Sequence, residues 1–282
     1  MYCKEVLFMN KRSGTLLCAA AAAAAVPLWL LMPGRASAAK RAPFTGVNFA
    51  HRGLHSRDRS IPENSLEAFR LAAEAGYGME LDVQLSKDGK VVVFHDDDLL
   101  RVCGMEGKVC ERTFGELSEL RLCGTEQRIP LFSDVLSVID GRGPLIVELK
   151  PGKSNRELCE KTNAILSGYS GEVCIESFDP NIVKWFRLHA RKLLRGQLAM
   201  PAGEYAGNLH PALRFALSRC FLNFLGRPQF IAYETGRLPL AVQLCHKLGA
   251  MNVCWTSHEP SNENGRDGVI FEYYRPRRKF RG

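Results

Sequence analysis

The 282-residue sequence lacks the cysteine spacings that hold metal ions or disulfide frameworks. Its ten cysteines include no Cys-x-x-Cys pair, and the closest two, Cys103 and Cys110, stand seven positions apart. Cysteines scattered through apolar runs are typical of buried, reduced thiols. Because so many thiols would be awkward in an oxidising compartment, the pattern favours a reducing habitat or a cytoplasmic-facing domain.

The chain also lacks a basic excess in its central part. The formal net charge is +8, but residues 1–41 and residues 275–282 carry +5 each, which leaves −2 for the residues between them. The globular part therefore does not have the charge expected of a protein that binds nucleic acid. The basic tail is either a solvated chain end or a segment attracted to an anionic membrane surface.

A long apolar run stands near the amino terminus, at residues 15–32, with Lys11 and Arg12 just before it. This pattern predicts a membrane-directed segment outside the fold, at the lower limit of length for a spanning helix. Ala36-Ser37-Ala38 offers a cleavage site, so a cleaved signal peptide, with export of the domain, and a retained membrane anchor both stay open. We therefore divide the chain into residues 1–41, signal or anchor with linker, and residues 42–282, a globular domain with a basic tail.

No Gly-rich dinucleotide turn follows the first predicted strand, which argues against a doubly wound open sheet. From residue 46 onward, short apolar runs alternate with amphipathic helical segments. This α/β alternation predicts a closed (β/α)8 TIM barrel without a second domain. Strands are expected at 47–50, 77–82, 145–150, 173–178, 195–200, 230–234, 252–256 and 268–272, and helices at 65–75, 133–139, 155–166, 181–193, 211–224 and 238–248.

A β-hairpin extension is expected after the second strand. Lys87-Asp88-Gly89 separates two runs rich in β-branched and alternating residues, which is a hairpin signal. A turn centred near Asp88 would bring His95 back within about one position of Glu80.

Carboxylates stand at the ends of two predicted strands. Glu80 and Asp82 are two positions apart and therefore share one face of a strand, and Glu148 occupies a similar place in the run Val-Glu-Leu-Lys. In a barrel the carboxyl ends of the strands converge, where such charges would repel one another without a cation. Hard oxygen ligands suit Ca²⁺ or Mg²⁺, so we expect one divalent cation here.

Two histidines and two cations belong to the same end of the predicted barrel. His51 and His95 are suited to act as general base and general acid near neutral pH. Arg52 and Lys150 supply the fixed positive charge that a phosphate group requires. Glu63 is expected to hydrogen-bond Arg52 or the substrate site, and its plain alternative is a first-turn acid favoured by the helix dipole.

The joined motifs resemble one family. AHRG, PENS followed by Ala-Phe, GMELDVQLSKDGKVVVFHD, VELK, ESF and a late WT are similar to the glycerophosphodiester phosphodiesterase family over residues 46 to about 273. The resemblance implies a TIM barrel that hydrolyses glycerophosphodiesters to glycerol 3-phosphate and an alcohol such as choline or ethanolamine. It also implies attack by the substrate's own glycerol hydroxyl, which gives a cyclic phosphate that water opens.

The same resemblance assigns the site residues. It makes His51 and His95 the acid–base pair, Arg52 and Lys150 the phosphate contacts, and Glu80, Asp82 and Glu148 the metal ligands. The chain departs from many members at the end of the last strand, where Phe271-Glu272 stands in place of Thr-Asp, and it lacks a long insertion after His95.

Three alternatives stay open at this point. The nearest is the same chemistry on a lysophospholipid, which the N-terminal apolar segment encourages. A non-catalytic, membrane-tethered binding barrel is the second. A glycosidase that uses Glu80 and Glu148 is the third, but it leaves both histidines and both cations without a role. The sequence contains no long heptad pattern, so it does not indicate an oligomeric state.

Overall fold

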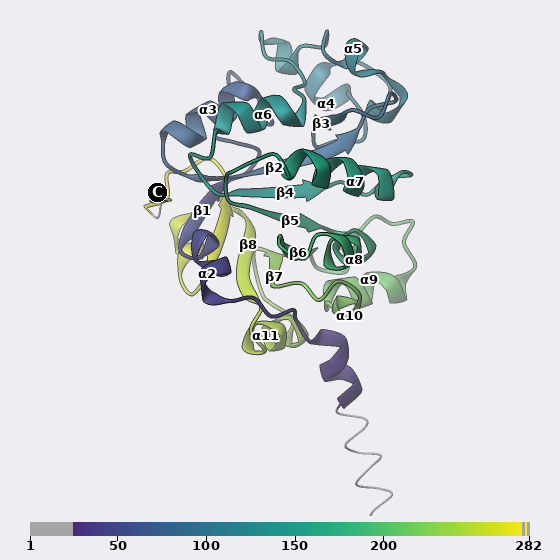
Figure 1. Cartoon of the computed structure of the whole chain (residues 1–282), viewed down its shortest axis with the longest axis vertical. Coiled ribbons are helices and arrows are strands. Elements are labelled where there is room, and N and C mark those ends of the chain that lie inside the picture. The colour runs from purple at the N-terminus through teal and green to yellow at the C-terminus, as the bar shows by residue number, and fades with distance from the viewer. Residues whose placement is uncertain (1–24, 278–279, 281–282) are drawn as a thin grey trace, which may run out of the picture.

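A closed barrel of parallel strands forms the centre of the molecule. The computed structural model describes residues 25–277 and residue 280. Over those residues the sheet order is β1-β9-β8-β7-β6-β5-β4-β2-β3, and a further pairing of β1 with β2 closes it. All pairs are parallel except the hairpin pair β2–β3, so eight strands make the barrel and confirm the predicted fold (Figure 1).

The barrel strands lie within a few residues of their predicted positions. The largest difference is β2, which runs on to Leu85 because it continues into the hairpin. The strands are β1 Val47–Ala50, β2 Gly78–Leu85, β4 Leu145–Leu149, β5 Val173–Ser177, β6 Leu194–Ala199, β7 Phe230–Glu234, β8 Met251–Ser257 and β9 Gly268–Phe271.

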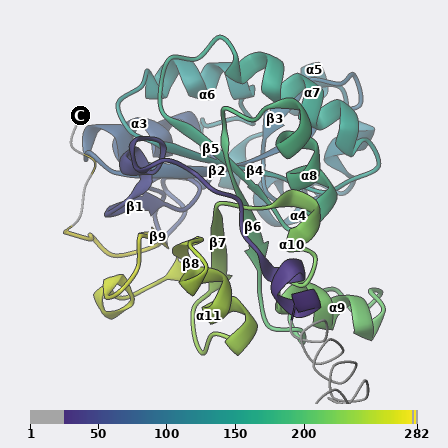
Figure 2. The same ribbon diagram turned by 60° about the horizontal axis from the view of Figure 1, so that its bottom comes forward.

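Helices surround the barrel in Figures 1 and 2. Ser65 caps α3, Leu66–Glu74, because its hydroxyl accepts a hydrogen bond from Ala68 N. The longer helices are α3 Leu66–Glu74, α6 Phe132–Ile139, α7 Asn155–Leu166, α8 Pro180–His189, α9 Pro211–Ser218 and α11 Leu240–Lys247, with the shorter α2 Ala38–Arg41 and α10 Asn223–Gly226. The helix expected over 211–224 is broken, because Cys220 has a positive φ of 58° and the chain resumes as α10.

The predicted hairpin is present. β3, Val91–Val93, pairs antiparallel with β2, and Val83 faces Val93 in its register. Extending that register places His95 beside Leu81, one position from Glu80. The turn depends on Gly89, whose φ of +71° lies in the left-handed region that glycine adopts readily.

A small unit of residues 95–131 follows the hairpin, and we call it the satellite unit. It contains α4 Leu100–Cys103, α5 Phe114–Leu117 and short 3₁₀ turns, and its apolar side chains, among them Leu99 and Leu117, pack under β3 as a cluster of their own. Figure 1 shows it at the top of the molecule, to one side of the barrel.

The ends of the chain are described only in part. Residues 15–24 of the predicted membrane-directed segment, together with Cys3 and Cys18, lie outside the described residues. Residues 278, 279, 281 and 282 of the basic tail lie outside them as well. Residues 25–31 form a helix. In the described part of the chain, no helix combines the length and apolar character that crossing a bilayer requires. All eight described cysteines are free thiols, and five of them are buried.

Candidate active site

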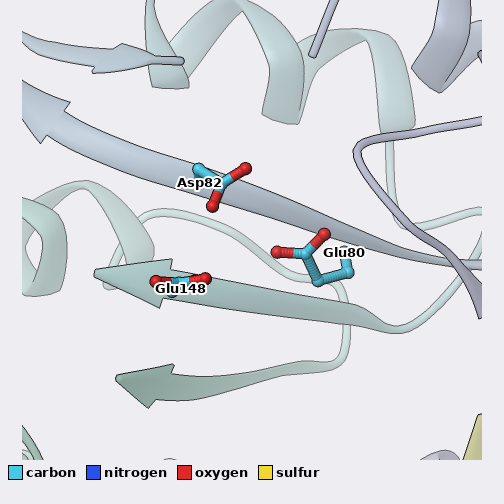
Figure 3. A group of neighbouring side chains, drawn as sticks. All are labelled: Glu80, Asp82 and Glu148. Carbon is cyan, nitrogen blue, oxygen red and sulfur yellow. The ribbon is translucent and has the colours of Figure 1, made fainter. Parts of the chain in front are cut away.

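Three buried carboxylates from two neighbouring strands form the floor of the site. Glu80 and Asp82 stand two positions apart on β2, so both side chains point toward the barrel interior. The β2–β4 register pairs Asp82 directly with Glu148. Each offers an oxygen, and these oxygens all lie within 4.8 Å of one another (Figure 3). The three side chains predicted as metal ligands are therefore brought together by strand register alone.

The electrostatics of this cluster favour a cation. Burial and then the neighbouring carboxylates raise the pKa of Glu80 well above its usual value. Burial alone would raise the pKa of Asp82 as well, but His95, Lys150 and Arg52 together hold that pKa far below its usual range. Asp82 Oδ1 is buried without a hydrogen-bond donor within the described chain. A cluster of three carboxylates with an orphaned oxygen fits a hard divalent cation such as Ca²⁺ or Mg²⁺.

His51 follows β1, where the barrel closes. Its Nδ1 lies 2.5 Å from Glu272 Oε1, just after β9, and its Nε2 lies 3.8 Å from Glu80 Oε2. The carboxylate fixes the proton on Nδ1 and leaves the Nε2 lone pair facing the pocket. Burial lowers the pKa of His51 to about 4, with Arg52 adding to this effect and Glu272 opposing it. The imidazole is therefore neutral at neutral pH and able to accept a proton.

His95 comes from the other side, after β3. Its Nδ1 lies 2.6 Å from Asp96 Oδ1, and Arg101 Nε binds the second oxygen of Asp96 at 2.6 Å. The Asp96 carboxylate orients this imidazole, and the His95 side chain is 30% exposed and lines the pocket, so its Nε2 can reach a ligand there.

Arg52 is held through both its backbone and its side chain. Its backbone N–H donates to Glu80 Oε2 at 3.0 Å, and its Nη1 donates to Glu63 Oε1 at 2.7 Å. Its φ of 53° is unusual for a residue other than glycine, and such strain is typical of functional sites. Gly53 follows because a Cβ at that position would lie 2.8 Å from Ala68 in α3.

Glu63 holds two arginines. Besides Arg52, it accepts from both Arg101 Nη1 and Arg101 Nη2, at 2.7 and 2.6 Å. Glu63 precedes the Ser65 cap, so the alternative of a first-turn acid in α3 is wrong. A direct contact of Glu63 with substrate stays a prediction.

Lys150 is the second cation of the site. Its Nζ lies 3.0 Å from Glu148 Oε1 and 3.6 Å from Asp82 Oδ1. Burial would lower the pKa of Lys150, but Glu148 and Asp82 outweigh it and raise that pKa. Lys150 is therefore charged and lies beside two of the expected ligands.

One cavity of about 120 Å³ is lined by five of these residues, His51, Arg52, Glu80, His95 and Glu148. One wall is apolar and aromatic, with Phe178 and Trp255 packed edge to face at 5.5 Å between ring centroids. A larger hollow of about 540 Å³ beside Leu188 and His189 has no carboxylate in its lining, so size alone does not locate the chemistry.

Four side chains of the site had no predicted role. Glu176 on β5 is 1% exposed and lines the cavity, and burial followed by Glu148 and Asp82 raises its pKa. Asn64 Nδ2 donates to Asp82 Oδ2 at 2.9 Å, while Asp96 and Glu272 each face a histidine. Glu176 and Glu272 stand at strand ends like the predicted ligands, and that position was the available signal.

The comparisons with known proteins agree on one family. Residues 51–273 match the model of the glycerophosphoryl diester phosphodiesterase family. The chain is 31% identical over 227 residues to a Mycobacterium tuberculosis protein named probable glycerophosphodiester phosphodiesterase 2, covering 76% of this chain and 80% of that protein. It is 30% identical over 146 residues to a human lysophospholipase D, covering 47% of this chain and 45% of that one.

A solved structure is similar to this chain in both fold and sequence. The crystal structure of a glycerophosphodiester phosphodiesterase from Thermotoga maritima is 27% identical, with a TM-score of 0.62, and the match covers 80% of this chain and 93% of that one. The chain spans about half the length of several other curated relatives that it matches.

Proposed function

The chain belongs to the glycerophosphoryl diester phosphodiesterase family, and from this premise we propose that it hydrolyses glycerophosphodiesters to glycerol 3-phosphate and an alcohol. The observation that carries the proposal is a cluster of three carboxylates with Lys150 beside two of them, next to a cavity that is lined by Arg52 and by two histidines with different partners. A phosphodiester requires this combination, because its charge must be neutralised and protons must move at two oxygens.

Glu80, Asp82 and Glu148 would hold one divalent cation, Ca²⁺ or Mg²⁺. When bound, the cation would supply Lewis acidity toward the phosphoryl group. Arg52 and Lys150 bring positive charge to the same group, Arg52 through a planar fork that matches phosphate oxygens. Glu63 and Arg101 keep Arg52 in place through the contacts described above.

His51 acts as the base in this proposal. Its Nε2 accepts the proton of the substrate's glycerol hydroxyl as that oxygen attacks phosphorus, while Glu272 stabilises the imidazolium that forms. His95, held by Asp96, donates a proton to the departing alkoxide of the head group. The cyclic phosphate that results is opened by water with the two histidines in reversed roles, which returns both to their starting states.

A lysophospholipid is the second candidate substrate. The aromatic wall of Phe178 and Trp255 favours it, since that wall offers an apolar surface beside the reacting phosphate. The similarity to a human lysophospholipase D supports the same reading. We also propose that the protein associates with a membrane through the apolar segment at residues 15–32.

Glycerol 3-phosphate release by the full chain tests the proposal. We expect release from soluble diesters such as glycerophosphocholine, lost with chelator and restored by Ca²⁺ or Mg²⁺. His51→Ala and Glu80→Ala should each lower kcat by about 100-fold or more. Glu119→Gln is the matched control, because that carboxylate is 80% exposed and far from the cavity.

Each other outcome has a defined meaning. Turnover of lysophospholipid without turnover of soluble diesters would move the assignment to the second candidate. A folded protein that is inactive on both would overturn the proposed activity and leave a binding role.

A further inference from the structure

The segment that precedes β1 packs against the outside of the barrel. Leu31 is 3% exposed and belongs to an apolar cluster with Cys220, Val242 and Cys245. Leu31 O accepts a weak bond from Cys245 Sγ at 3.5 Å, and Gly34 N donates to Pro228 O at 2.9 Å. We call residues 29–35 the strap.

The surface of the barrel fits the strap closely. Arg227 Nη1 donates to both Trp29 O, at 2.7 Å, and Met32 O, at 2.9 Å. A Cβ on Gly34 would lie only 2.2 Å from Arg227 O, so the close approach of the two backbones requires glycine. Without the strap, this apolar cluster would open to solvent and Pro228 O would lose its donor. Such a fit is expected of a permanent part of the fold and not of a segment that is removed after Ala38.

Exposed apolar side chains lie on the strap and beside it. Figures 1 and 2 show helix 25–31 beside α9 and α10, and Figure 1 places them at the opposite end of the molecule from α4 and α5. Six large apolar residues are each 39–58% exposed there, and we call them the apolar face: Val26, Leu28, Trp29, Met32, Leu213 and Phe215. A cluster of this size marks an interaction site more often than scattered apolar residues do.

Two features identify a lipid surface as the partner. The Arg219 guanidinium lies 3.8 Å from the Phe215 ring centroid and that of Arg227 lies 5.0 Å from Trp29, so cations border the apolar side chains. Arginine and tryptophan combine in this way at the level of lipid head groups. The chain that leads into helix 25–31 is also apolar from residue 15 onward.

We propose that the protein retains its N-terminal apolar segment and rests on a lipid bilayer through the apolar face. The strap joins the two, because it fixes the point where the segment meets the barrel and so sets which side of the barrel lies on the membrane. The inference rests on the strap and the apolar face and does not depend on the proposed catalysis.

The first experiment tests retention. We expect the intact mass of the full chain, purified from membranes, to include residues before Ala39. Leu31→Ser should lower the Tm of this protein by about 5–10 °C, because a buried side chain is lost. Leu28→Ser, at a residue 39% exposed, is the control and should change the Tm by less than about 2 °C. A mature terminus at Ala39, or a Leu31→Ser protein with unchanged Tm, would overturn retention.

The second experiment tests the apolar face itself. The full chain is reconstituted into phosphatidylcholine–phosphatidylglycerol vesicles that contain brominated acyl chains, which quench tryptophan on contact. The Phe215→Trp variant should show an additional quenched component relative to the parent. Leu100→Trp should not, although Leu100 is 58% exposed, because α4 lies at the other end. Equal quenching of both variants, or of neither, contradicts lipid contact at α9. Absence of quenching with a doubled molecular mass would assign the face to a second copy of the chain.

Discussion

Replacing Glu272 with glutamine removes the negative charge that lies 2.5 Å from His51 Nδ1. In the proposed reaction that charge stabilises the imidazolium formed when His51 takes the hydroxyl proton. A hydrogen bond to a charged group contributes about 1.5–3 kcal/mol. A loss of about 2–3 kcal/mol at the transition state lowers kcat by about 30- to 150-fold. The KM should change by less than about threefold, because Glu272 does not contact the phosphate group in this scheme.

The pH profile gives a second readout with a defined sign. Burial lowers the pKa of His51 to about 4, and Glu272 opposes this effect by stabilising the protonated ring. Without the carboxylate, the pKa of His51 falls further. The base then stays neutral to lower pH, so the acidic limb of the kcat profile moves to lower pH while the plateau falls. The measurement is glycerol 3-phosphate release against pH for both proteins with saturating Ca²⁺ or Mg²⁺.

Two variants complete the design. Glu272→Asp keeps the charge and should retain more activity than the glutamine variant, while exposed Glu259→Gln should behave as the parent. A glutamine variant with kcat within twofold of the parent, or an acidic limb that moves upward, would refute the role of Glu272.

Three further predictions follow from the same contacts. Glu80→Gln should raise the Tm of the metal-free protein at pH 7–8 but not near pH 4, since a buried carboxylate with a raised pKa costs stability only where it must ionise. Scanning calorimetry with chelator tests this, and added Ca²⁺ should stabilise the parent more than the variant. Arg52→Lys should lower kcat/KM by about 10- to 100-fold through loss of the bidentate fork, and unchanged kinetics would remove Arg52 from phosphate binding. Ser65→Ala should lower the Tm by about 2–4 °C through loss of the α3 cap, whereas exposed Ser133→Ala should not.

The sequence predicted the barrel and most of the site because both depend on local patterns. Each strand is a short apolar run, and Glu80, Asp82 and Glu148 are the carboxylates within two of these runs. Strand register then sets the positions of these carboxylates, since pairing β2 with β4 brings Asp82 opposite Glu148.

Contacts between distant parts of the chain were beyond prediction from the sequence. The His51–Glu272 bond joins residues 221 positions apart, and it exists only because β9 pairs with β1. The break between α9 and α10 depends on the backbone of Cys220, for which no glycine or proline gave a signal. The packing of Leu31 on the barrel was likewise hidden, because an apolar run near the amino terminus indicates a membrane before it indicates a core.

The pairing of the first and last strands also sets an order in time. As the chain is synthesised, all three expected metal ligands exist once residue 148 has been made, and His95 is already present. His51 N bonds to Phe271 O at 3.0 Å, and Glu272 reaches His51 only when β9 has inserted beside β1. Barrel closure and completion of the proposed base are therefore a single event at the end of synthesis. The residues of the acidic floor are therefore synthesised more than 100 positions before the carboxylate that completes the proposed base.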